Sequence, residues 1–123
     1  MTRLDTTIAR RVAENYESAV NDNDFAAVTA LFAPDGFVQH PARGRHEGTE
    51  EILAFYQTQF ERQPRLRLLN IGVAADVCYA EFEGSRAGSD EVGLVVDIFG
   101  IGEGGELRSN VICLGPRLPF QRA

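Results

Sequence analysis

The spacing of apolar residues changes once along the chain, and this change sets the class of fold. Before Pro64, apolar residues recur every three or four positions, as in Ile8, Val12 and Tyr16, which is typical of amphipathic helices. After Pro64 they recur every second position, as in Leu66-Arg67-Leu68, which is typical of strands. Helices that precede a run of strands predict an α+β fold, with three helices packed on one face of a curved antiparallel sheet.

Capping and turn residues delimit the predicted helices. Asp5, Asp24 and Thr49 are each suited to cap a helix. The second helix should end at Ala33-Pro34-Asp35-Gly36, because proline and glycine disfavour a helix interior. A short β segment, Phe37 to His40, and a polar loop at 42–48 should separate the second helix from the third.

Four strands are predicted in the second half, at 66–68, 77–83, 91–101 and 106–114. The glycine-rich turn 102–105 should join the last two as an antiparallel hairpin. A chain of 123 residues is long enough to bury a core, so we expect one domain over residues 1–123.

The basic residues are twelve arginines, and lysine is absent. Without lysine there is no Schiff-base chemistry and no GxxxxGK phosphate loop. The net charge of −6 and the pI near 4.8 argue against nucleic acid and membrane surfaces as partners. A small neutral or cationic ligand is expected instead.

The cysteines and histidines do not predict a metal site. Cys78 and Cys113 lie in apolar runs without CxxC spacing, so both are expected to be buried, reduced thiols. His40 and His46 lack carboxylates at a spacing typical of metal ligands, and His46 is expected at the surface. The sequence shows neither a signal peptide nor an apolar run long enough to span a bilayer, so a cytoplasmic location is expected.

Asp97 is the most informative candidate for chemistry, because it interrupts the apolar run 92–99. It either points to water from an edge strand or is buried. Burial would raise the pKa of its carboxyl by about 3 units, which costs about 4 kcal/mol at neutral pH. Such a cost would indicate a functional role.

Tyr16, Tyr56 and His40 are the other candidates. Each tyrosine is either a core aromatic or a hydroxyl donor in a pocket. His40 is either a histidine in water at the end of its segment or a proton carrier, since its ordinary pKa near 6.5 suits a base. Arg43 and Arg45 either lie in a solvated loop or flank the mouth of a pocket.

Several segments resemble the ketosteroid isomerases. The resemblance rests on the segments 16–24 and 31–36, on Gly48 ahead of 52–56, and on the Asp97 strand with its glycine-rich turn. These isomerases belong to the nuclear-transport-factor-2-like superfamily, with SnoaL-like polyketide cyclases, scytalone-type dehydratases and limonene-type epoxide hydrolases. The resemblance implies a cone of three helices closed by a strongly bent sheet around an apolar pocket. It also implies a homodimer formed through the outer face of the sheet.

The resemblance also implies roles for individual residues. Tyr16 and a neutral Asp97 match the two donors to the substrate oxyanion, and Tyr56 matches the tyrosine that supports them. His40 stands where the isomerases carry the aspartate that shuttles the proton. The remaining pocket or supporting residues are Phe32, Val38, Phe55 and Phe99.

The function that follows is a cofactor-free, isomerase-like enzyme that transfers a proton on a hydrophobic carbonyl compound, such as a steroid. In this hypothesis His40 is the base, and Tyr16 and Asp97 form the oxyanion hole. One alternative is a dehydratase, cyclase or epoxide hydrolase that uses a His–Asp pair. Another is a noncatalytic module that binds a small apolar molecule.

Overall fold

The computed structural model describes residues 4–117, with side chains up to Gly115. The helices are α1 (Thr6–Asn21), α2 (Phe25–Ala30) and α3 (Gly48–Gln59), which continues into a 3-10 turn at Phe60–Arg62. The strands are β1 (Phe32–His40), β2 (Gly44–Glu47), β3 (Pro64–Ala74), β4 (Val77–Arg86), β5 (Gly93–Ile101) and β6 (Leu107–Arg117). No helix within residues 4–117 is long and apolar enough to cross a membrane.

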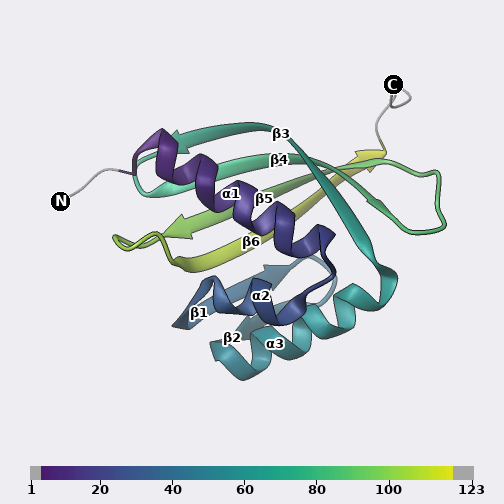
Figure 1. Ribbon diagram of the computed structural model, residues 1–123, viewed down its shortest axis with the longest axis horizontal. Coiled ribbons are helices and arrows are strands. Elements are labelled where there is room, and N and C mark those ends of the chain that lie inside the picture. The colour runs from purple at the N-terminus through teal and green to yellow at the C-terminus, as the bar shows by residue number, and fades with distance from the viewer. Residues whose placement is uncertain (1–3, 118–123) are drawn as a thin grey trace.

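All six strands form one curved sheet in the order β2-β1-β6-β5-β4-β3. The predicted α+β fold is confirmed, with helices on the concave face of a strongly bent sheet (Figure 1). β5 and β6 form the predicted antiparallel hairpin. One pair of neighbouring strands differs from the predicted antiparallel sheet, because β1 runs parallel to β6. These two strands are far apart in sequence, so no tight turn forces them to be antiparallel.

The segment around Pro34 is a strand and not the end of a helix. α2 stops at Ala30, and Phe32 already belongs to β1. The pairing of β1 with β6 shifts between Phe32 and Phe37, so Pro34 and Gly36 lie in an irregular part of the strand. A side chain at Gly36 would approach the Ala33 carbonyl oxygen at 3.1 Å, which explains why glycine occupies this close approach.

Three other expectations are corrected. The predicted polar loop 42–48 contains β2, which pairs with the end of β1. α3 is capped by Glu47, whose backbone N–H donates to the Glu51 carboxylate at 2.9 Å, and not by Thr49. Cys78 is buried but Cys113 is exposed, because alternate residues of β6 face away from the core.

Two side chains of α1 fasten this helix to β3. Asn21 donates from Nδ2 to the Leu66 carbonyl at 2.8 Å and accepts from the Leu66 N–H at 2.8 Å. Glu17 accepts from the Leu68 N–H at 2.6 Å. β3 is an edge strand, so these side chains satisfy backbone groups that lack a neighbouring strand. We call the two hydrogen bonds between Asn21 and Leu66 the Asn21 bridge. This bridge holds α1, and with it Tyr16, against the sheet.

We expect Asn21→Ala to lower the free energy of unfolding by about 1–3 kcal/mol, because it leaves two part-buried backbone groups without partners. Asn21→Asp keeps the acceptor and loses the donor, so its loss should be smaller. Urea unfolding measures both. Asp22→Ala, at the neighbouring exposed position, is the control; an equal loss there would show that the bridge contributes nothing specific.

Candidate active site

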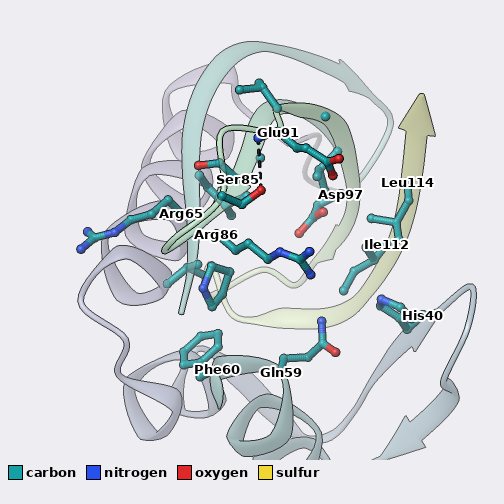
Figure 2. Close-up of a pocket in the computed structure, with 18 of the residues that line it drawn as sticks. His40, Gln59, Phe60, Arg65, Ser85, Arg86, Glu91, Asp97, Ile112 and Leu114 are labelled. Atoms are coloured by element: carbon teal, nitrogen blue, oxygen red, sulfur yellow. Dashed lines mark hydrogen bonds between the residues drawn. The ribbon is translucent and has the colours of Figure 1, made fainter. Parts of the chain in front are cut away.

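A cavity of about 490 Å³ opens between the concave face of the sheet and the ends of α1 and α3. Its size is typical of small-molecule sites. Figure 2 shows side chains from several strands and from α3 pointing into it. The apolar part of its wall is formed by Val20, Phe60, Leu66, Val95, Ile112 and Leu114. Four candidates predicted from the sequence, namely Tyr16, His40, Tyr56 and Asp97, line this same cavity.

Asp97 is buried, with 1% of its surface exposed. β5 lies inside the sheet between β4 and β6, so the edge-strand interpretation was wrong. Burial raises the pKa of its carboxyl from 3.8 to about 7, although hydrogen bonds from Asn110 and Tyr16 act in the opposite direction. Its Oδ2 accepts from Asn110, and its buried Oδ1 has no hydrogen-bond partner in the described chain.

Asn110 is a buried residue that the sequence analysis missed. Its Nδ2 lies 3.1 Å from Asp97 Oδ2 and 3.3 Å from each of the Tyr16 and Tyr56 hydroxyls. The amide therefore connects the three candidates that sit deepest in the site. The available signal was a lone amide at a position of β6 that faces inward, between Leu107 and Ile112, which are both buried.

The two tyrosines form a hydroxyl pair. Their oxygens are 3.0 Å apart, and one hydroxyl donates to the other. Burial is the largest cause that raises the pKa of Tyr16 well above 10, and the charges of Tyr56 and Asp97 add to it. Burial also raises the pKa of Tyr56. Both hydroxyls are therefore protonated at neutral pH and can act as neutral donors.

His40 lies at the cavity wall in a fixed tautomer. Its Nδ1 accepts from the backbone N–H groups of Ala42 at 3.1 Å and Arg43 at 3.3 Å. A neutral imidazole with Nδ1 as acceptor carries its proton on Nε2. Burial, followed by the charges of Arg43 and His46, lowers the pKa of His40 below 6.5. Within the described chain, the hydrogen bonds of His40 go to this turn and those of Asp97 to the Asn110 group.

The other predicted residues do not line the cavity. They lie in the core, and the aromatic ones pack against the two tyrosines. Phe99 packs against Tyr16 with ring centroids 5.1 Å apart. Phe55 and Phe32 pack against Tyr56 at 4.9 and 6.1 Å. Val38 is fully buried in the core. These apolar contacts hold the tyrosine rings in place.

Arg43 and Arg45, expected either in a solvated loop or at the mouth of a pocket, do not line the cavity. Arg43 donates to the Phe55 carbonyl and to Gln59 Oε1, and Arg45 pairs with Glu47. The lining arginines are Arg65 and Arg86. His46, which was expected at the surface, is partly exposed, and its ring centroid lies 5.0 Å from that of Phe55.

No three His, Cys, Asp or Glu side chains gather as metal ligands would anywhere in residues 4–117. The polar groups that converge in the site are instead a carboxyl, two phenols and an amide. Together they can accept one proton at Asp97 and donate hydrogen bonds to an oxygen atom from the tyrosines.

The raised pKa of Asp97 makes the stability of the protein depend on pH. The folded state holds this proton more tightly than the unfolded chain, so the stabilisation is complete below pH about 4 and is lost as the pH rises to about 7. We expect Asp97→Asn to gain about 4 kcal/mol in unfolding free energy relative to wild type between pH 4 and 8. Urea unfolding across this range measures the difference. Asp35→Asn, at an exposed position, gives the background, and parallel curves for wild type and Asp97→Asn would contradict the prediction.

Solved structures similar to this chain share its fold at low sequence identity. A SnoaL-like protein of unknown function from Burkholderia thailandensis superposes with a TM-score of 0.80 at 14% identity, covering 94% of this chain and 100% of that one. A proposed ketosteroid isomerase from Kribbella flavida gives 0.75 at 16% identity, covering 95% and 84%. An epoxide hydrolase of the LEH-like type from M. tuberculosis gives 0.73 at 17%, covering 88% and 83%.

Sequence comparison identifies the family directly. No curated protein matches the chain. A family model described as the SnoaL-like domain matches residues 12–110. This range runs from the middle of α1 to Asn110 and includes all the groups that meet at Asp97. The chain therefore belongs to the SnoaL-like domain family, within the superfamily that its resemblance to the ketosteroid isomerases implied.

Proposed function

We propose that this protein is a cofactor-free, isomerase-like enzyme that transfers a proton on a hydrophobic carbonyl compound. The observation that carries the proposal is Asp97, a buried carboxyl with a pKa of about 7 that faces an apolar-walled cavity beside Tyr16. A group with a pKa near the working pH can both take and return a proton. Membership of a family whose fold is shared by a proposed isomerase and an epoxide hydrolase supports an enzyme-like role.

In the proposed reaction, the carbonyl oxygen of the substrate accepts a hydrogen bond from the Tyr16 hydroxyl. Ionised Asp97 takes a proton from the carbon next to the carbonyl through Oδ1, and the C–H electron pair forms an enolate. The same carboxyl then returns the proton to a carbon further along the conjugated system, which moves the double bond. Asn110 holds Oδ2 and leaves Oδ1 for the substrate.

This proposal gives the base role to Asp97, whereas the sequence favoured His40. The reason is the tautomer of His40: Nε2 carries the proton, and Nδ1 is bonded to two backbone N–H groups. Protonation at Nδ1 would break both bonds. A His–Asp pair has no support either, because within the described chain the two side chains form hydrogen bonds with different groups.

A noncatalytic binding module is the weaker alternative. Holding Asp97 in its buried position costs about 4 kcal/mol when the carboxyl is ionised. An apolar residue at position 97 would line the inner end of the cavity, here called its floor, without this cost. The retained carboxyl, linked through Asn110 to two phenol donors, favours chemistry over simple binding.

The test uses 2-tetralone, a bicyclic ketone whose exchange of α-protons with D₂O is followed by NMR. We expect Tyr16→Phe to lower the catalysed exchange rate by about 10²–10³-fold and Asp97→Asn by about 10²–10⁴-fold. The wild-type rate should rise with pH and level off above about 7, because the ionised form of Asp97 is the base.

Asp35→Asn, outside the cavity, is the control for general effects on folding. A rate that falls through pH 7 would show that protonated Asp97 is the active form, and this would overturn its role as base. A hundredfold loss in His40→Gln, with Asp97→Asn nearly intact, would return the base role to His40.

We also propose that the outer face of the sheet pairs with a second copy of the chain. On β5, Leu94, Val96 and Ile98 alternate with Val95, Asp97 and Phe99, and all three are only partly covered. Tyr79, which pairs with Ile98, is 43% exposed. The nearby Arg67–Glu83 ion pair, 2.8 Å long, neutralises its own charges, and Glu81, which pairs with Val96, is a further acidic side chain of this face.

Ile98→Arg should convert this dimer into a monomer, because it would place two charges in an apolar interface. Sedimentation equilibrium measures the mass. Ile8→Arg is a matched control, since Ile8 is an exposed apolar residue on α1, 37% accessible. A wild-type protein that sediments as a monomer would contradict this proposal and leave the catalytic one untouched.

A further inference from the structure

The mouth of the cavity carries an arginine that forms no ion pair with another described residue, in a lining that also contains Glu91. Arg86 ends β4 and lines the cavity, and Figure 2 shows its side chain reaching into the cavity above the amide of Gln59. Within the described chain, the ion pairs join Arg45 to Glu47 and Arg67 to Glu83. The other lining arginine, Arg65, donates to the Asn21 carbonyl at 3.0 Å. Of the two lining arginines, Arg86 is thus the one whose side chain has no hydrogen bond or ion pair to another described residue.

Gln59 presents its donor end to the same space. Its Oε1 accepts from Arg43 Nη1 at 2.8 Å, which fixes the orientation of the amide. The NH₂ group therefore points away from Arg43, and Figure 2 shows the amide nitrogen on the side of Arg86. Arg43 is itself held by the Phe55 carbonyl at 3.1 Å and lies over the Phe55 ring. The donor end of Gln59 is oriented by contacts outside the cavity.

His40 contributes a third donor in the same way. The turn after β1 occupies its Nδ1 with two backbone N–H groups, so Nε2 carries the proton. The acceptor atoms of both Gln59 and His40 are thus used within the protein. What the three residues offer to the cavity is a guanidinium, an amide NH₂ and an imidazole N–H, all of them donors.

We propose that this donor set binds a carboxylate on the substrate, at the opposite end from the carbonyl group. A planar guanidinium binds carboxylates through two parallel hydrogen bonds, and two further N–H donors can satisfy the remaining lone pairs. The substrate class is then an amphipathic keto acid: its carbonyl lies at Asp97 and Tyr16, its apolar body against Ile112 and Leu114, and its carboxylate at the mouth. This inference rests on the proposed function for the position of the carbonyl end.

A carboxylate ligand differs from the neutral or cationic ligand expected from the sequence. That expectation came from the net charge of −6, which describes the whole surface. Charge pairs interact strongly only within a few ångströms, and salt screens exposed charges beyond about 8–10 Å. The local set at the mouth therefore decides which ligand is bound there.

The probes for the test are 6-hydroxy-2-naphthoate and its methyl ester, which share one shape and differ in one charge. The phenol of either probe takes the place of the substrate oxygen at Tyr16. Calorimetry should show that wild type binds the acid at least about tenfold more tightly than the ester, in line with a charge-assisted pair. Arg86→Gln should remove most of this difference and leave the affinity for the ester within about twofold.

Gln59→Glu is the sharper variant, because it keeps the Oε1 contact to Arg43 and replaces the NH₂ donor by a charged oxygen. We expect it to weaken binding of the acid by about tenfold or more and to spare the ester. Arg62→Gln removes the same charge as Arg86→Gln at an exposed position outside the cavity. It should leave the ratio of acid to ester affinity unchanged.

Equal affinities of wild type for the two probes, or equal effects of Arg86→Gln on both, would overturn the carboxylate site. The proposed function fails separately. If Tyr16→Phe changes the affinity of neither probe while Arg86→Gln still discriminates between them, the carboxylate site stands and the placement of the carbonyl end falls.

Discussion

The chemical character of this cavity depends on the burial of one carboxyl group. Asp97 projects from the middle of the sheet into the space enclosed by α1, α3 and the concave face, where water cannot solvate its charge. Burial raises its pKa to about 7, and the donors Asn110 and Tyr16 keep it from rising further. The balance between these opposing effects leaves a carboxyl that can change its protonation state at neutral pH.

The strong curvature of the sheet makes this site possible. A flat sheet would pack directly against the helices, whereas the bent sheet leaves a cavity with an apolar wall and a polar floor (Figure 1, Figure 2). The Asn21 bridge holds α1 on the edge strand, and aromatic contacts from Phe99 and Phe55 hold the two tyrosines. The floor is thereby rigid, and its donors are oriented before any ligand enters.

The two ends of the cavity carry different hydrogen-bonding groups. At the floor, a carboxyl oxygen without a partner can accept a proton. At the mouth, the acceptor atoms of His40 and Gln59 are occupied by the protein, so these two residues present donors to the cavity. Such a polarity fits a ligand held in one direction. Apolar burial alone would hold a hydrophobic molecule without choosing which end goes in first.

The α+β class, the three helices, the last four strands and the unusual place of Asp97 in an apolar run were predictable from the sequence, because period, caps and a charge in an apolar run are local signals. The positions of Tyr16 and Tyr56 on the apolar faces of their helices were predictable for the same reason. The roles of Asn110, Arg86 and the His40 tautomer were not. Asn110 meets Tyr16 across 94 positions of sequence, and the direction of a hydrogen bond at Gln59 or His40 depends on a neighbour that only folding supplies. The sequence by itself determined which groups are costly to bury; the tertiary structure decided which partners they meet, because those contacts join residues that no local pattern connects.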